Sequence, residues 1–358
     1  MRTARLCKAL RCSVDCAAMR AVAMRLGWRM NLPPQFTIVT PAFNQAQYLE
    51  QAIRSVVEQR DVRIEYFVFD GGSTDGSAAI IEKYARVLAD WSSAPDAGQT
   101  DAIVRGWSRA HGAFVAWLNS DDYYMPDALA LVAAEFERDE QIQVVIGACL
   151  MVDEHGAVIG RKYAREFNLH TMLTTSGGVP GQPAVFVRRS LVAAVGLPDA
   201  ALHYVMDWEY WMRLALHLRS GQVRVMHTAL AVVRSWPGTK TRTGVEAICR
   251  EHRAVLERLF AAGTLPLELQ ALRSTALAGT HLKQSFLEWQ AGLNGAAWRS
   301  LVFARKISAA SVAGWRGIGL RLRLLLPYRL YNRLQTQVRL FKAGASSKLE
   351  TAGAPRLA

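Results

Sequence analysis

The stretch FVAWLNSDDYYMPDAL, residues 114–129, passes from a strand pattern to a helix pattern. An apolar run over 114–118 is followed by Asn-Ser-Asp-Asp over 119–122, and then by aromatic residues and Pro126. The apolar run predicts a buried strand, and a proline in a first turn predicts a helix over 126–138. Two adjacent carboxylates at the end of a buried strand are costly unless a positive charge compensates them. The sequence around this stretch indicates which positive group could compensate the two carboxylates.

Strand and helix patterns alternate around this stretch. Strands are predicted at 36–41, 64–70, 91–94, 113–118 and 144–150, and helices between them at 46–59, 75–88, 99–110 and 126–138. Such alternation predicts an α/β fold with an open, mostly parallel sheet and helices on both faces. Ligands bind beyond the carboxyl ends of the strands in these sheets. We therefore expect Asp121 and Asp122 at a binding crevice rather than inside a core.

The pattern changes after residue 150. It predicts a hairpin, a Gly/Pro-rich loop, a short strand at 184–187 and an amphipathic helix over 207–218, and it is almost wholly helical from 245 to about 310. One part of that helical region resembles a single tetratricopeptide hairpin, and a plain helical cap is the alternative that we favour. We predict a basic N-terminal tail over 1–33 and a main α/β domain over 34–240. That domain would have a nucleotide-binding half (34–150) and an acceptor half (151–240). A helical extension (241–310) and a basic amphipathic tail (311–358) would follow.

The net charge of +13 is concentrated at the two ends of the chain. Residues 299–348 carry eleven Lys and Arg and no acid, whereas 31–298 holds 24 basic and 28 acidic residues. A body without excess positive charge argues against nucleic acid, and we expect no nucleic acid partner. The basic amphipathic segment 311–345 predicts peripheral contact with an anionic membrane. A helix that packs on the protein with a solvated basic face is the alternative.

The apolar runs of the chain are all shorter than 18 residues, so no membrane span is expected. Charges dispersed through the N-terminal segment do not predict a signal peptide. The expected location is the cytoplasm, with peripheral attachment to the inner face of the cytoplasmic membrane.

Five motifs follow one another along the chain: TIVTPAFNQAQYLEQAIRSVVEQ (37–59), FDGGSTDGS (69–77), APDAGQTDAIVRGW (94–107), AWLNSDDYYMPDAL (116–129) and GQPAVFVRRSLVAAVGLPDAALHYVMDWEYWMRLA (181–215). Together they resemble family 2 glycosyltransferases, the inverting nucleotide-sugar enzymes of the GT-A fold, over about 35–240. The resemblance implies a GT-A domain that transfers a sugar from a nucleotide-sugar donor, UDP-linked being the commonest, to a hydroxyl of a glycan or lipid-linked acceptor. Similar sequences build bacterial surface polysaccharide or lipopolysaccharide.

The resemblance also implies a donor site. Its nucleotide-binding residues would be Thr40, Pro41, Asp70, Asp96, Gln99, Asp101, Asn119, Ser120 and Asp121. Thr40, Pro41 and Asp70 would line the nucleobase and ribose, and Asp96 would lie beside the nucleotide.

The acidic pair fills the metal motif of the family, so the resemblance implies Mg²⁺ or Mn²⁺ on Asp121 and Asp122. Asn119 stands where many relatives have Asp, and it is at most a neutral oxygen ligand. Hard cations prefer oxygen ligands, and such an ion stabilises the charge that develops on a diphosphate leaving group. The alternative is a helix cap at Pro126, which Asp122 alone would provide.

The resemblance places the catalytic base at Asp207, in the motif MDWEYW, and Glu209 is the rival. A single positioned carboxylate can accept the proton of an acceptor hydroxyl. An N-cap role is the alternative for Asp207. The three aromatic side chains of this motif either stack on a sugar or pack in the core of the helix.

The motif RSWPGTKT (234–241) forms a Pro/Gly-containing loop after the last predicted strand. Arg234 and Lys240 either close over a diphosphate from this loop or remain solvated.

Two other classes of function compete. A nucleotidyltransferase is expected to carry a glycine-rich loop with basic residues after its first strand, where this chain has TPAFNQAQ without any base. A catalytically inactive sugar-binding or scaffold protein is disfavoured by the acidic residues Asp70, Asp121, Asp122 and Asp207.

Overall fold

The computed structural model describes residues 33–163, 166–174, 179–240, 244–313, 315–328 and 330–331. The predicted N-terminal tail up to residue 32, and the predicted amphipathic tail beyond residue 331, lie outside these described residues.

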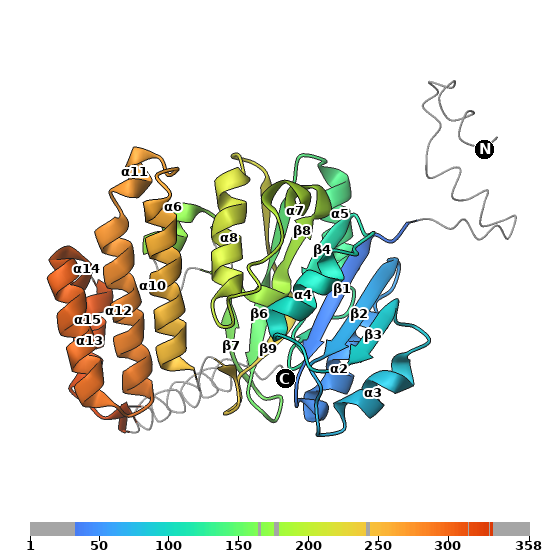
Figure 1. The fold of residues 1–358 in the computed structure, drawn as a ribbon, viewed down its shortest axis with the longest axis horizontal. Coiled ribbons are helices and arrows are strands. Elements are labelled where there is room, and N and C mark those ends of the chain that lie inside the picture. The colour runs from blue at the N-terminus through green and yellow to red at the C-terminus, as the bar shows by residue number, and fades with distance from the viewer. Residues whose placement is uncertain are drawn as a thin grey trace, which may run out of the picture.

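The described strands form one nine-stranded sheet in the order β3-β2-β1-β4-β8-β6-β9-β5, with β7 paired to β6 (Figure 1). They are β1 (Phe36–Ala42), β2 (Ile64–Asp70), β3 (Asp90–Ser93), β4 (Phe114–Trp117), β5 (Tyr123–Tyr124), β6 (Val144–Val152), β7 (Val158–Lys162), β8 (Val185–Arg188) and β9 (Val223–Arg234). The predicted parallel arrangement holds for β3, β2, β1 and β4. Antiparallel β8 then lies between β4 and β6, so the whole sheet is mixed. Periodicity could not predict this insertion, because it does not specify which strands pair.

Helices cover both faces of the sheet and continue beyond it. They are α2 (Ala46–Val57), α3 (Ser77–Tyr84), α4 (Gln99–Trp107), α5 (Ala128–Arg138), α6 (Leu169–Thr174), α7 (Arg189–Val195), α8 (Met206–His217), α10 (Val245–Ala261), α11 (Leu267–Gln270), α12 (Arg273–Gln290), α13 (Asn294–Ile307), α14 (Ala309–Ala313) and α15 (Trp315–Leu324). The helix predicted from Pro126 begins two residues later, with Asp127 as its N-cap at φ +58°.

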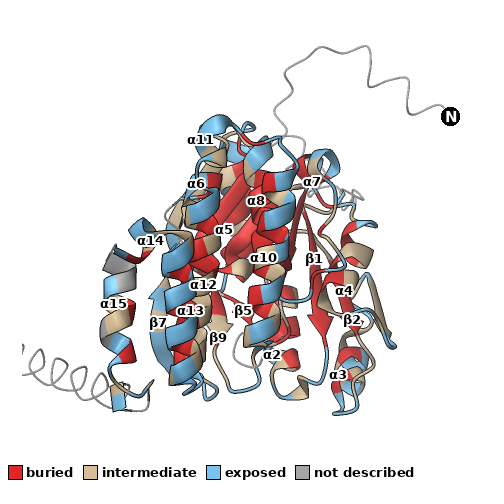
Figure 2. Cartoon of the chain, turned by 60° about the vertical axis from the view of Figure 1, so that its left-hand side comes forward, coloured by how far each residue is buried: buried red, intermediate tan, exposed pale blue. Residues whose placement is uncertain are grey.

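Alternation along the strands divides the core between the two faces of the sheet. In β4, Val115 and Trp117 join the cluster that includes residues of α4 and α8, whereas Phe114 and Ala116 join the cluster that includes residues of α2 and α5. Figure 2 shows the buried residues gathered on the strands and the inner sides of the helices. Two-sided burial explains why these strands read as continuous apolar runs.

The helices predicted after residue 245 are present; α10 packs on α12 and stands between α12 and α8 in Figure 1. The outer helices have a core of their own, centred on Trp289, Leu301 and Leu320. Among the described residues, no helix combines the length and the apolar character needed to cross a membrane.

Candidate active site

A cavity of about 780 Å³ opens at the carboxyl ends of β1 and β4. The parallel register brings these strand ends to one edge of the sheet, since Ala42 pairs with Asp70 and Ile38 with Ala116. The predicted site residues that line this cavity are Pro41, Asp96, Gln99, Asn119, Ser120, Asp121, Asp122 and Asp207. The structure thus brings together residues that lie up to 166 positions apart in the chain.

The acidic pair lies between the end of β4 and the short strand β5. Asp122 is buried, and its carboxylate accepts hydrogen bonds from the Arg234 backbone N–H (3.0 Å) and from Asn119 Nδ2 (3.4 Å). Asp121 is half-buried, and its Oδ2 accepts a hydrogen bond from Trp236 Nε1 at 2.9 Å. Both carboxylates therefore have their orientation set by groups from the end of β9 and the loop that follows it.

The electrostatics of this pair match a divalent cation. Burial raises the pKa of Asp121, and burial together with the negative charge of Asp121 raises the pKa of Asp122 well above its usual value. The guanidinium of Arg234 opposes these shifts only in part. Within the described residues no group of three or more His, Cys, Asp or Glu side chains forms a complete metal cage. Two carboxylates that share their ion with phosphates and water are a usual set for Mg²⁺, so the donor set fits.

Arg234 is not free to close over a ligand. Its guanidinium donates to the carbonyl of Asp121 (3.3 Å) and to Gln51 Oε1 (2.7 Å), and it lies 4.4 Å from the ring centroid of Tyr48. Arg234 is also buried, with 6% of its surface exposed. These contacts make it a structural support for the acidic pair rather than a mobile phosphate-binding residue.

Lys240 also lines the cavity, and with Arg234 it completes the Lys and Arg side chains of the lining among the described residues. Its Nζ donates to Gln99 Oε1 at 3.1 Å and to the His203 carbonyl at 3.4 Å. Gln99 Nε2 in turn donates to Asn119 Oδ1 at 2.7 Å. A chain of hydrogen bonds therefore runs from Asn119, beside the acidic pair, through Gln99 to Lys240 and the segment before α8.

Two predicted nucleotide-binding residues lie behind the cavity wall. Asp70 is fully buried, and its carboxylate accepts hydrogen bonds from Ser73 Oγ and from Ser93 Oγ (2.6 Å). Thr40 is also fully buried and shares a hydrogen bond of 2.8 Å with the hydroxyl of Tyr66. The hydrogen bonds of Asp70 to Ser73 and Ser93 indicate that Asp70 shapes the loop after β2. Neither the Asp70 nor the Thr40 side chain lines the cavity.

The loop before α4 brings other predicted residues to the cavity. Asp96 accepts a hydrogen bond from the Gly98 N–H at 2.8 Å, and Gly98 adopts φ +107°, a conformation that favours glycine. Ser120 is buried and bonded to Gln45 through its hydroxyl. Asp101, in the first turn of α4, does not line the cavity.

Asp207 lines the cavity from the first turn of α8. It is not the N-cap, because the helix begins at Met206 after Val205. Its Oδ1 lies 2.7 Å from the Trp208 N–H. Burial raises the pKa of Asp207, and the Trp208 N–H and the charges of Lys162 and Lys283 partly oppose that rise.

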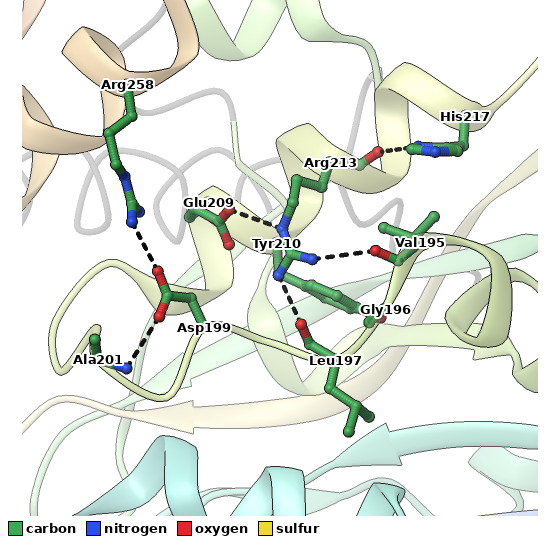
Figure 3. Close-up of polar contacts among 10 residues, drawn as sticks. All are labelled: Val195, Gly196, Leu197, Asp199, Ala201, Glu209, Tyr210, Arg213, His217 and Arg258. Carbon is green, nitrogen blue, oxygen red and sulfur yellow. Dashed lines mark hydrogen bonds and ion pairs between the residues drawn. The ribbon is translucent and has the colours of Figure 1, made fainter. Parts of the chain in front are cut away.

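Glu209 does not line the cavity, and its carboxylate points toward Arg213 on the same helix (Figure 3). It is 9% exposed, and its Oε1 lies 2.7 Å from Arg213 Nε. Arg213 also donates to the carbonyls of Val195 and Leu197, so the pair fastens the loop after α7. The surroundings of Glu209 therefore suit a structural role, in which it holds Arg213 against the loop after α7.

The aromatic residues beside Asp207 pack in the core. Trp211 stacks on Trp117 with ring centroids 5.1 Å apart, and the hydroxyl of Tyr210 donates to the Gly196 carbonyl. Trp208 lies against the ring of His252 at 4.6 Å.

Several cavity residues were not predicted as site residues: Phe43, Gln45, His203, Tyr204 and Trp236. Phe43 and Gln45 follow the first strand directly, and that position was the one available signal. Trp236 lies 115 residues from Asp121 in sequence, and local pattern carries no information about their contact.

Two solved structures share the fold. TarS residues 1–349 from S. aureus, in complex with UDP-GlcNAc, align with a TM-score of 0.55 at 18% identity over 85% of this chain and 92% of that chain. The mannosyltransferase PcManGT from Pyrobaculum calidifontis, in complex with GDP-Man and Mn²⁺, aligns with a TM-score of 0.54 at 16% identity over 89% and 93%. Identities this low establish the fold alone, and it is the GT-A fold with C-terminal helices that the sequence predicted.

Sequence similarity then defines the family. Residues 37–192 match the model of Glycosyl transferase family 2. An uncharacterised glycosyltransferase of Mycobacterium tuberculosis (strain CDC 1551 / Oshkosh) is 31% identical over 192 residues, which are 52% of this chain and 71% of that protein. The chain belongs to the family 2 glycosyltransferases, as predicted. The family match ends before Asp207, so the role of that residue has to be argued from its place in the structure.

Proposed function

We propose that this glycosyltransferase is a metal-dependent inverting enzyme that moves a sugar from a UDP-linked donor to a hydroxyl acceptor in the synthesis of bacterial surface polysaccharide or lipopolysaccharide. One observation carries the proposal. A single cavity holds both a pair of carboxylates suited to a metal–diphosphate group and a separate carboxylate, Asp207, to which no basic side chain of the described residues is bonded.

On the donor side, Asp121 and Asp122 would hold Mg²⁺ or Mn²⁺, and the ion would neutralise the charge that develops on the leaving diphosphate. Asn119 would orient Asp122 through its amide. The cavity residues Pro41, Asp96 and Gln99 are proposed to contact the nucleotide, with Ser120 holding the loop beside it. The complexes of TarS with UDP-GlcNAc and of PcManGT with GDP-Man and Mn²⁺ are consistent with such a donor.

On the acceptor side, Asp207 would accept the proton of the attacking hydroxyl. The new bond then forms on the face of the sugar opposite the leaving group, which inverts the anomeric centre. The raised pKa of Asp207 makes it a stronger base than an exposed carboxylate, and it remains ionised at neutral pH as long as that pKa lies below the working pH.

A screen of nucleotide sugars tests the proposal directly. The purified protein should release nucleotide from at least one of a panel of UDP-, GDP- and dTDP-sugars with Mn²⁺, slowly with water as acceptor. Chelation of the metal should abolish that release. The proposal would be contradicted if no donor in the panel were hydrolysed and none raised the melting temperature of the protein.

Lys240 is expected to bind the diphosphate, because this residue lines the cavity. Burial lowers the pKa of Lys240, and a bound anion beside its Nζ would raise that pKa again. A hydrogen bond to a charged group contributes about 1.5–3 kcal/mol, so Lys240→Met should weaken UDP binding by about 10- to 100-fold. Titration calorimetry with UDP and Mn²⁺ measures this.

Lys240→Arg should retain part of the affinity. Lys83→Met is the matched control, because Lys83 is exposed and pairs with Glu50 on the surface. Equal affinities for Lys240→Met and Lys83→Met would show that Lys240 does not contact the diphosphate.

The acceptor is proposed to be lipid-linked, with peripheral attachment of the enzyme to an anionic membrane through its basic tail. The described part of that tail packs partly on the protein, because Leu320 and Leu324 are buried in the outer helical core. Leu325 and Leu330 nevertheless remain 69% and 45% exposed. Residues 332–348 add four Lys and Arg and no acid, and they lie outside the described residues.

Deletion of 332–358 should abolish co-sedimentation with vesicles that contain anionic phosphatidylglycerol, because five basic residues are lost while the outer helical core stays intact. Vesicles of phosphatidylcholine alone should bind neither form. Unchanged sedimentation of the shortened chain would disprove attachment through this tail.

A further inference from the structure

The segment before α8 forms part of the cavity but lacks the usual helix cap. His203, Tyr204 and Asp207 line the cavity, and α8 begins at Met206 without a side-chain hydrogen bond from its N-cap residue. Backbone N–H groups at the start of a helix have no partner within the helix and need one elsewhere. The position of Asp207 depends on how this turn is held.

The partner comes from the helical extension. Glu251, on α10, accepts hydrogen bonds from three successive backbone N–H groups: His203 at 3.1 Å, Tyr204 at 2.8 Å and Val205 at 3.1 Å. One carboxylate thus holds the three residues that lead into α8. Val205 is the N-cap residue of α8, so the same carboxylate also provides a partner for the N–H at the start of the helix.

Close packing supports this contact. Gly244 is the N-cap of α10, and a Cβ at that position would lie 2.2 Å from Cε1 of Tyr204. Only glycine allows α10 to approach the segment this closely. Thr100 Oγ1 donates to the Leu202 carbonyl at 2.5 Å, which fixes the same segment from the side of α4.

An ion pair also joins α10 to the same loop, at a residue that does not line the cavity. Arg258 Nη1 lies 3.0 Å from Asp199 Oδ2, and Arg213 holds the loop from α8 (Figure 3). Asp199 does not line the cavity. Among the residues that the structure describes, α10 thus makes polar contacts with this loop through Glu251 and Arg258. Of these two, the Glu251 contact involves residues that line the cavity.

We propose that Glu251 is a positioning residue for Asp207, so that the helical extension is a required part of the active site. The inference rests on the proposed role of Asp207 as the base. Loss of Glu251 leaves three N–H groups without their partner and allows the first turn of α8 to shift. A displacement of about 1 Å at a catalytic group can lower a rate by about a hundredfold.

Glu251→Ala is expected to lower kcat for donor hydrolysis by about 10- to 100-fold, with KM for the donor within about threefold of wild type. The donor is the nucleotide sugar that the wild-type protein hydrolyses fastest in the panel. Glu251→Gln, which keeps one acceptor oxygen, should lose less. Arg258→Ala, the matched control on the same helix, should keep wild-type kcat because its ion pair is partly exposed and neither partner lines the cavity.

A double mutant separates positioning from a general loss of stability. If Glu251 acts through Asp207, then Glu251→Ala should lower the rate of Asp207→Asn by less than about threefold, since coupled residues are not additive. A full further loss in that background, or wild-type kcat in Glu251→Ala alone, would overturn the inference.

Hydrogen exchange of the full chain gives a test that needs no substrate. The amides of 203–205 should exchange at least about tenfold faster in Glu251→Ala than in wild type or Arg258→Ala, while those of β1 stay unchanged. Unaltered exchange would refute the positioning role. If no donor in the panel were hydrolysed, the proposed function would fail, and the exchange result would still decide whether Glu251 holds this segment.

Discussion

Replacing Asp121 with asparagine is expected to lower sugar transfer by on the order of a thousandfold or more, and Asp122→Asn should do the same. A metal ion contributes several kcal/mol to the stabilisation of charge in a transition state, and each 1.36 kcal/mol corresponds to a factor of about ten in rate. Neither neutral amide can replace the charge that holds the ion. Both rates are measured as nucleotide release with Mn²⁺, beside metal-dependent binding of UDP.

The fold should survive these substitutions. Asparagine at 121 can still accept the Trp236 N–H through its oxygen, and removal of one charge relieves the repulsion that raises the pKa of Asp122. The melting temperature of the metal-free protein should therefore not fall for Asp121→Asn. Full activity in an excess of chelator, or normal turnover by either variant, would show that the acidic pair does not hold a catalytic metal.

Replacing Asp207 with asparagine is expected to reduce turnover by at least about a hundredfold, the usual order for removal of a general base. Binding of UDP and Mn²⁺ should be retained, because Asp207 lies on α8 and makes no contact with the acidic pair. Burial raises the pKa of Asp207, so activity should fall as the pH decreases through a value above the ordinary range for aspartate. A pH–rate profile of the wild-type protein measures that acidic limb.

Glu209→Gln is the control for this prediction, because residues two apart on a helix face different directions. It disturbs the ion pair with Arg213, so we expect a loss of about 1 kcal/mol of stability and nearly unchanged kcat. The reverse order of damage, with Asp207→Asn close to wild type, would transfer the role of base to Glu209.

The sequence predicted the alternating elements well because each depends on local pattern. The strand at Ile64–Asp70 lies where expected, since a largely apolar run ends at the turn-forming glycines Gly71 and Gly72. The antiparallel strand β8 lies between β4 and β6 for a different reason. Its place depends on side chains such as Phe186, which packs on Phe36 from a segment 150 residues away.

The structure places the predicted site residues in different surroundings. Asp121, Asp122 and Asp207 line the cavity. Asp70 and Glu209 belong to equally conspicuous motifs but lie outside the cavity lining. A motif indicates that a carboxylate is present, whereas its hydrogen-bond partners decide whether it faces a ligand.

The sequence by itself determined the α/β class, the family and the edge of the sheet at which the site lies, because these follow from periodicity and from motifs within short segments. Only the tertiary structure decided which charges are available there. Arg234 and Lys240 belong to one short motif, yet Arg234 ends β9 and is held by Gln51 and Asp121, whereas Lys240 lies in the loop beyond and bonds to Gln99. The tertiary structure also showed that Glu251, from the helical extension, holds the turn before Asp207. The physical reason is that burial and hydrogen bonding depend on the close approach of residues far apart in the chain, and local patterns do not encode that approach.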